Sequence, residues 1–128
     1  MGTILVVEDL APLRRMTVEA LQGDGYQVLE AAEGREALLL AKSCPGPIHL
    51  ILTDVVMPHM TGRELADWLK RSHPEIRVLY MSGYAPEVIS SRGLLGPGEW
   101  YIAKPFSLDS LLAKVHEILG PTGVESAS

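Results

Sequence analysis

The chain has 128 residues, which is enough for one domain with a sizeable buried core. Its formal charge is −5 and its 11 Lys and Arg residues are scattered, which argues against direct binding of nucleic acid. The single cysteine, Cys44, excludes an internal disulfide and fits a reducing compartment. No apolar run is long enough to cross a bilayer and no signal peptide is visible, so we expect a cytoplasmic domain without direct membrane contact.

Short apolar runs alternate with helical patterns along the whole chain. Buried strands are predicted at residues 3–8, 26–31, 48–54, 76–82 and 100–104. Helices are predicted from Pro12 to the "GDG" at 23–25, at 34–43, from a capping box of Thr61 with Glu64 to about Ser72, from Pro86 to near Gly93, and at 107–119. We expect residues 1–120 to form the domain and residues 121–128 to form a flexible tail.

This alternation predicts parallel strand pairing, right-handed crossovers and helices on both faces of the sheet. The fold class is therefore α/β, a doubly wound three-layer α/β/α sandwich. For five parallel strands we expect the sheet order 2-1-3-4-5.

Polar residues occur where the predicted strands end. The first strand ends in Glu8 and Asp9, the third in Asp54, the fourth in Ser82 and the fifth in Lys104. Because ligands of open parallel sheets bind outside the carboxyl ends of the strands, these side chains predict a site at one edge of the sheet.

The charges of this edge predict a metal ion. Two carboxylates about 4 Å apart repel by roughly 1 kcal/mol in water and by roughly 4 kcal/mol at an effective dielectric constant near 20. We expect Lys104 to pair with only one of the three acids, and a hard cation such as Mg²⁺ to neutralise the others. Asp54 could then act as a nucleophile toward a phosphoryl group, whose oxygens would meet Ser82 and Lys104.

Four motifs resemble the receiver domain of response regulators in two-component signalling. They are "VVED" (6–9), "TDVVMPHMTG" (53–62), "YMSG" (80–83) and "AKPF" (103–106). The resemblance extends from about Thr3 to Leu119 and implies a flavodoxin-like fold and a phosphoprotein of a phosphorelay. Such a domain is not an enzyme in its own right, although it promotes its own phosphorylation and dephosphorylation. The Ser-Gly-Tyr at 82–84 and the Gly-Pro-Gly at 96–98 are most similar to receivers fused to hybrid sensor histidine kinases.

The resemblance also implies a metal site and a phosphoacceptor. Asp54 would accept a phosphoryl group from the phosphohistidine of a histidine kinase or a histidine phosphotransfer domain. Mg²⁺ (or Mn²⁺) would be bound directly by Asp9 and Asp54, by the backbone carbonyl of Val56, and by Glu8 mainly through water.

Further implied roles concern the response to phosphorylation. Ser82 would donate a hydrogen bond to the phosphoryl group, Lys104 would pair with it, and Ser82 and Tyr101 would act as the conformational switch. The Lys104-Pro105 bond would be cis. A homodimer through the fourth helix, fifth strand and fifth helix is left open, and so is a membrane-anchored parent protein.

Two residues beside the site differ from what many relatives carry. Val56 replaces a polar or charged side chain two positions after Asp54, and the bulky Tyr84 lies two positions after Ser82. Both positions flank the path of a hydrolytic water, so we expect slow loss of the phosphoryl group.

Other functions remain as alternatives. The chain could be a stand-alone single-domain response regulator, or a receiver-like interaction module that is never phosphorylated. A phosphatase of the haloacid dehalogenase type would need a second aspartate where Val56 stands. A flavin-binding domain would need a phosphate-binding loop where "EDLAPL" (8–13) places acids.

Overall fold

The structure is a computed structural model that describes residues 2–91, 93 and 99–120. Within these residues, five parallel strands form one sheet in the order β2-β1-β3-β6-β7. The strands of this sheet are β1 (Thr3–Val7), β2 (Gln27–Ala31), β3 (Leu50–Asp54), β6 (Arg77–Ser82) and β7 (Trp100–Ala103). The predicted order 2-1-3-4-5 is confirmed, because β6 and β7 are the fourth and fifth strands of the sheet. The expected tail and the Gly-Pro-Gly segment lie outside the described residues.

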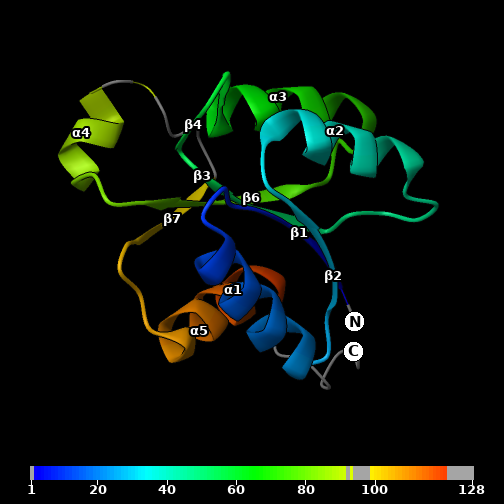
Figure 1. Cartoon of the computed structure of the whole chain (residues 1–128), viewed down its shortest axis with the longest axis horizontal. Helices are drawn as coiled ribbons and strands as arrows, with labels where there is room; N and C mark the ends of the chain where they lie inside the picture. The colour runs from blue at the N-terminus through cyan, green and yellow to red at the C-terminus, as the bar shows by residue number, and fades with distance from the viewer. Residues whose placement is uncertain (1, 92, 94–98, 121–128) are drawn as a thin grey trace.

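Helices cover both faces of the sheet, as predicted. They are α1 (Ala11–Gly23), α2 (Gly34–Ser43), α3 (Gly62–Ser72), α4 (Pro86–Ser91) and α5 (Leu108–Leu119). Helices α1 and α5 lie on one face, and α2 and α3 lie on the other (Figure 1). None of the described helices is long and apolar enough to cross a membrane.

The sheet separates two apolar cores because successive side chains of a strand point to opposite faces. In β1, Leu5 and Val7 pack in the core beneath α2 and α3, whereas Ile4 and Val6 pack in the core beneath α1 and α5. Both faces of the strand are thus buried, which explains why the strands appear as continuous apolar runs in the sequence.

A small hairpin follows the third strand of the sheet and was not predicted. Strands β4 (Val56–Met57) and β5 (Met60–Thr61) pair antiparallel across Pro58 and His59. His59 has a φ of 70°, and proline followed by a residue of positive φ is typical of a type II turn. The hairpin holds Val56 beside Asp54 and leads the chain directly into α3.

Helix α3 begins with the predicted capping box. The hydroxyl of Thr61 accepts a hydrogen bond from the Glu64 backbone N–H at 3.1 Å, and the Glu64 carboxylate accepts one from the Thr61 N–H at 2.9 Å. Two backbone donors at the start of the helix are therefore satisfied.

Gly62 is the contact point between α3 and the end of β3. A Cβ atom at this position would lie 2.2 Å from the Asp54 carbonyl oxygen and 3.2 Å from Cγ2 of Thr53. The Gly62 N–H also donates to the Val55 carbonyl at 2.8 Å. Only glycine allows α3 to lie this close to the backbone of Asp54.

We predict that Gly62→Ala lowers the free energy of unfolding by about 1–3 kcal/mol or more, because the start of α3 and the end of β3 must move apart to make room for the added Cβ. Urea denaturation followed by circular dichroism measures the change. Gly46→Ala is the control, since its added Cβ meets nothing within 4 Å. Equal stability of the two variants would contradict the close approach.

Candidate functional site

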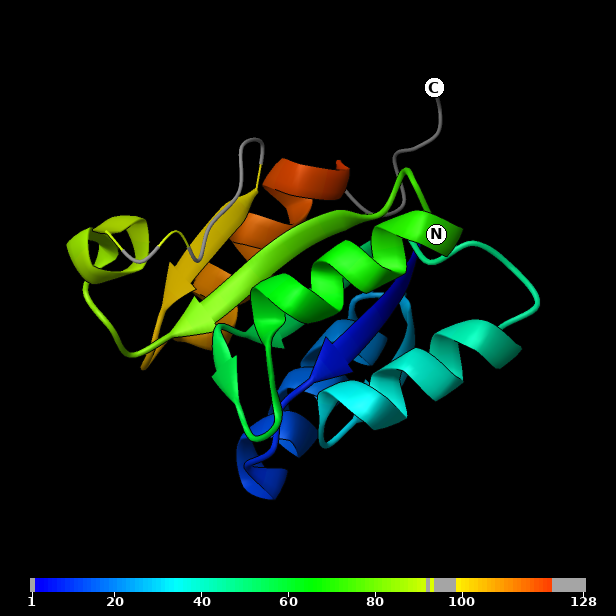
Figure 2. The same ribbon diagram turned by 90° about the horizontal axis from the view of Figure 1, so that it is seen from above.

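The carboxyl ends of four strands bring the predicted polar residues together. Glu8 and Asp9 follow β1, Asp54 ends β3, Ser82 ends β6, and Lys104 follows β7. The strands of the sheet run the same way, as the arrows of β1, β6 and β7 show in Figure 2, so these ends meet at one edge.

Beside this edge lies an open pocket of about 230 Å³. It is lined by residues from four strand ends and the segments after them, including Asp9, Asp54, Val56, Ser82, Tyr84 and Lys104. The pocket therefore brings the phosphoacceptor candidate together with the predicted Asp9, Ser82 and Lys104, whereas Glu8 does not line it.

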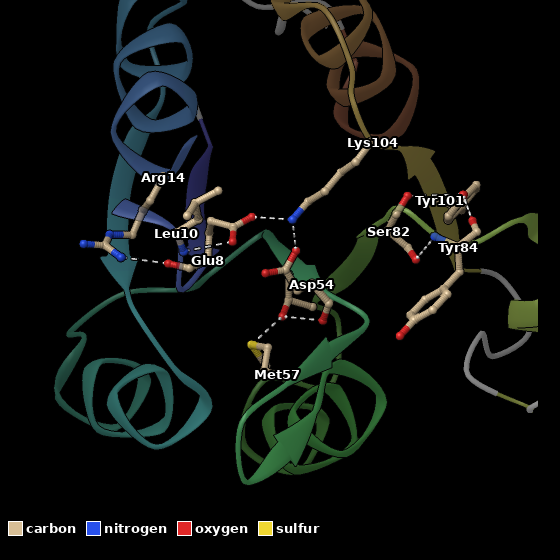
Figure 3. A network of polar contacts seen from close by, with 10 residues as sticks. Glu8, Leu10, Arg14, Asp54, Met57, Ser82, Tyr84, Tyr101 and Lys104 are labelled. Atoms are coloured by element: carbon tan, nitrogen blue, oxygen red, sulfur yellow. Dashed lines mark hydrogen bonds and ion pairs between the residues drawn. The ribbon is translucent and has the colours of Figure 1, made fainter. Parts of the chain in front are cut away.

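Lys104 pairs with two carboxylates and not with one, so that part of the sequence-based prediction was wrong. Its Nζ lies 2.7 Å from Oε1 of Glu8 and 2.5 Å from Oδ1 of Asp54 (Figure 3). The two acids come from neighbouring strands and stand on either side of the ammonium group, which has three donors. The side chains of Glu8 and Asp54 are only 1% and 7% exposed, so water screens these ion pairs little.

Glu8 is held by further hydrogen bonds from its own neighbourhood. Its Oε2 accepts from the Leu10 N–H at 3.1 Å, and its backbone carbonyl accepts from Nη1 of Arg14 at 2.8 Å. Nε of Arg14 also contacts Glu30 at 3.2 Å. This role of Arg14 was not predicted from the sequence. The only sequence signal for it was the position of Arg14 in the first turns of the helix that follows Glu8 and Asp9.

Burial and proximity shift the pKa values of the buried acids in opposite directions. The pKa of Asp54 is raised from its ordinary 3.8 to about 7, mainly by burial and also by the adjacent Glu8, while Lys104 partly offsets both. Burial also acts to raise the pKa of Glu8, but its hydrogen bonds with Asp54 and Lys104 outweigh burial and lower it. The pKa of Lys104 is raised, because the two carboxylates outweigh its burial. One ammonium group thus does not fully neutralise this edge.

The acids fit a hard cation. Glu8, Asp9 and Asp54 each offer a carboxylate oxygen, and these oxygens lie within 4.8 Å of one another. Asp9 is exposed, whereas Glu8 and Asp54 are buried. Oxygen ligands of this kind and number suit Mg²⁺. Burial and the adjacent Glu8 raise the pKa of Asp54, and a bound cation would favour its charged form.

The loop after β6 is tied to the site by two side chains. The Ser82 hydroxyl oxygen accepts from the Tyr84 N–H at 2.9 Å. The Tyr101 hydroxyl donates to the Tyr84 carbonyl at 2.7 Å and lies 3.4 Å from the Ser82 carbonyl (Figure 3). Ser82 and Tyr101 therefore contact the same segment, and the Lys104 N–H donates to the Ser82 carbonyl at 2.8 Å. The implied cis bond between Lys104 and Pro105 is present.

Comparison with known proteins assigns this arrangement to a family. The family model of the response regulator receiver domain matches residues 4–116 of the sequence. The chain belongs to this family.

Similar receivers occur both inside larger proteins and alone. The chain is 41% identical to the sensor kinase CckA of Brucella abortus (strain 2308) over 119 residues, which are 92% of the chain and 12% of that kinase. It is 31% identical to the response regulator receiver protein CpdR of the same strain, over 93% of the chain and 98% of CpdR. The chain spans about half the length of each of four similar transcriptional regulators, between 47% and 53%.

Solved receiver structures share the fold. The chemotaxis protein CheY4 of Vibrio cholerae matches with a TM-score of 0.80 and 30% identity, covering 93% of the chain and 99% of CheY4. The receiver domain of the hybrid histidine kinase CckA matches with a TM-score of 0.72 and 32% identity, covering 92% and 99%. The parallel five-stranded sheet of this receiver is thus that of its family, as the sequence predicted.

We predict a pH-dependent gain of stability for Asp54→Asn in the metal-free receiver. The pKa of Asp54 is raised on folding from its ordinary 3.8 to about 7, so its favourable contribution is complete below pH 4 and is lost as the pH rises through 7. Asparagine does not titrate. The variant should therefore gain stability over the wild type from about pH 4 to 7, by at most about 1.4 kcal/mol per pH unit.

Urea denaturation in EDTA at pH 5 and pH 8 measures this gain. Asp67→Asn serves as the control, because that side chain is 60% exposed. A stability difference between Asp54→Asn and wild type that is the same at both pH values would show that folding does not raise the pKa of Asp54.

Proposed function

We propose that this receiver accepts a phosphoryl group on Asp54 from the phosphohistidine of a histidine kinase or a histidine phosphotransfer domain. The observation that carries the proposal is a nearly buried carboxylate, in contact with Lys104, that opens onto a pocket shared with Asp9 and Ser82. Membership in the receiver family supports the same assignment.

The chemistry assigns a role to each side chain. An oxygen of Asp54 attacks phosphorus, an O–P bond forms, the P–N bond to the imidazole breaks, and the imidazole nitrogen keeps the electron pair and takes a proton. Lys104, already 2.5 Å from Asp54, pairs with the added negative charge. The Ser82 hydroxyl oxygen accepts a hydrogen bond from the Tyr84 N–H, so its hydroxyl proton is available to donate a hydrogen bond to a phosphoryl oxygen.

The metal ligands in this proposal are the three acids and one carbonyl. Asp9, Asp54 and the Val56 carbonyl would bind Mg²⁺ directly, and Glu8 mainly through water. Both carboxylate oxygens of Glu8 already have partners, Lys104 and the Leu10 N–H, which supports an indirect role for it. When bound, the ion supplies positive charge that balances the acids and the phosphoryl oxygens.

Ser82 and Tyr101 are the proposed switch. A bound phosphoryl group shifts a conformational equilibrium only through contacts that it gains in one state. Ser82 lies where such a contact would form, and Tyr101 holds the carbonyl of Tyr84 in the same loop. Recruitment of Ser82 by the phosphoryl group would change this loop and, through Tyr101, the surface of α4, β7 and α5. Homodimer formation through that surface stays a prediction.

The comparisons favour a receiver that is part of a hybrid sensor histidine kinase. The receiver itself would lie in the cytoplasm, whether or not the parent kinase is anchored in a membrane. The identity to the sensor kinase CckA, 41%, exceeds the 31% to CpdR. The near-complete coverage of CpdR, 98%, keeps a stand-alone regulator as the second candidate. The full-length coding sequence decides between them.

We predict that the receiver gains one phosphoryl group when incubated with Mg²⁺ and a small phosphodonor such as acetyl phosphate. Intact-mass spectrometry measures the adduct, and its loss with hydroxylamine identifies an acyl phosphate. Asp54→Asn should abolish the adduct, whereas Asp67→Asn should retain it. An undiminished adduct on Asp54→Asn would place the phosphoacceptor elsewhere.

Dependence on the metal is tested with the same assay. Asp9→Ala should lose most of the Mg²⁺-dependent phosphorylation and most of the increase in Tm that Mg²⁺ causes in the wild type, because binding to the folded state alone stabilises it. The melting experiment keeps the metal site testable even if no phosphodonor is effective. An equal Mg²⁺-dependent increase in Tm for both proteins would rule out Asp9 as a ligand.

We predict slow self-dephosphorylation of this receiver. Val56 and Tyr84 both line the pocket and are 48% and 45% exposed, but the Val56 side chain cannot orient a water molecule by hydrogen bonding. Help from a positioned polar group is typically worth about 10²–10⁴-fold in rate. Val56→Asn should therefore speed loss of the phosphoryl group by about tenfold or more at saturating Mg²⁺, measured by mass spectrometry over time.

Tyr84→Ala tests the second part of this prediction, the covering of the approach by the aromatic ring. It should also speed the decay. Fast decay in the wild type that neither variant changes would mean that Val56 and Tyr84 only pack beside the pocket.

A further inference from the structure

A second concave site lies between the carboxyl-terminal ends of α2 and α3. It is a groove of about 570 Å³ whose floor and walls include Leu38, Ala41, Cys44, Trp68 and Leu69. An adjoining hollow of about 380 Å³ shares Ser72 and His73 with it and extends along residues 47–48 and 74–76. We call the first of these the α2–α3 groove.

The α2–α3 groove is remote from the acid edge. Helix α3 starts at Gly62, against the backbone of Asp54, and ends at Ser72. Its 11 residues span roughly 16 Å. The groove lies at the carboxyl-terminal end of this helix, and the backbone of Asp54 lies at the other end. Helices α2 and α3 lie side by side in both ribbon views (Figures 1 and 2) and contact each other. A molecule bound there need not touch the proposed phosphorylation site.

Trp68 provides an aromatic anchor at the rim of the groove. Its side chain is 51% exposed, and the guanidinium carbon of Arg71 lies 4.4 Å from the centre of its ring. This cation–π contact restrains the indole before any partner arrives. Exposed tryptophan and arginine beside a concave apolar surface are the residues that most often dominate binding energy at protein interfaces.

The charges around the groove favour an acidic partner. The exposed Lys42 and Arg71, with the half-buried His73, line it together with the apolar residues. Neither Lys42 nor Arg71 forms an ion pair with a carboxylate of the described residues. The chain as a whole carries −5, so this basic rim is a local feature. No carboxylate of the described residues lines the groove itself, and Glu75 lines the adjoining hollow.

We propose that the α2–α3 groove docks an acidic amphipathic helix of a partner protein. The apolar face of that helix covers Leu38, Leu69 and Trp68, and its carboxylates pair with Lys42 and Arg71. This is the helix-in-groove mode of recognition, with charge selecting the partner. A second copy of this chain fits less well, because two copies of charge −5 repel.

A designed peptide tests the proposal directly. The probe is a synthetic helix of about 15 residues with leucine on one face and glutamate on the other, and its counterpart carries lysine in place of every glutamate. Each is titrated into the ¹⁵N-labelled receiver. We expect the acidic peptide alone to shift the indole signal of Trp68 and the amides of Ala41 and Leu69, with saturation.

Two charge reversals and one truncation locate the binding. The double variant Lys42→Glu with Arg71→Glu should weaken binding of the acidic peptide by about tenfold or more. Arg35 is exposed on α2 outside the groove, so the control variant Arg35→Glu should leave the affinity unchanged. Trp68→Ala should also abolish saturable binding. Since all these side chains are exposed, the variants should fold, and Mg²⁺-dependent phosphorylation serves as the independent check.

Several results would overturn the proposal. They are absence of saturable shifts with the acidic peptide, equal binding of the lysine peptide, and an effect of Arg35→Glu as large as that of the double reversal. Shifts of Trp68 that depend on receiver concentration without any peptide would assign the groove to a second copy of the chain.

Discussion

One ammonium group between two buried carboxylates is the constraint on which the rest of the site depends. Nζ of Lys104 lies 2.7 Å from Glu8 and 2.5 Å from Asp54, and the three groups come from the ends of three different strands. Removing one partner from a buried ion pair typically costs 3–5 kcal/mol, because the remaining charge is left uncompensated. The lysine therefore stabilises the close approach of two acids that repel each other, but it leaves Asp54 with a raised pKa and room for a further cation.

The scaffold around this triad places Asp54 by contacts of the backbone. Gly62 brings the start of α3 against the Asp54 carbonyl, and the capping box at Thr61 fixes where that helix begins. On the other side of the site, Arg14 holds the backbone of Glu8 from α1. The acids are thus held by backbone geometry as well as by their charges, which is what a preorganised phosphoacceptor requires.

The repeating periods of the sequence were sufficient to predict the five strands of the main sheet, their order and the edge at which the polar residues meet. The hairpin at Val56–Thr61 was missed because strands of two residues carry no detectable period. The double pairing of Lys104 and the contact from Arg14 depend on side-chain positions that only the folded chain defines. The α2–α3 groove escaped notice for a similar reason, because its lining residues are distributed over two helices and appear in the sequence as ordinary helix surface.

The central claim, that Lys104 balances Glu8 and Asp54 together, is tested most directly by a double-mutant cycle in EDTA. The free energies of unfolding of wild type, Lys104→Met, Asp54→Asn and the double variant are measured in urea at pH 8. We expect Lys104→Met to cost clearly more in the wild type than in the Asp54→Asn background, with a coupling energy of at least about 1 kcal/mol. Additive effects of the two substitutions would contradict the account.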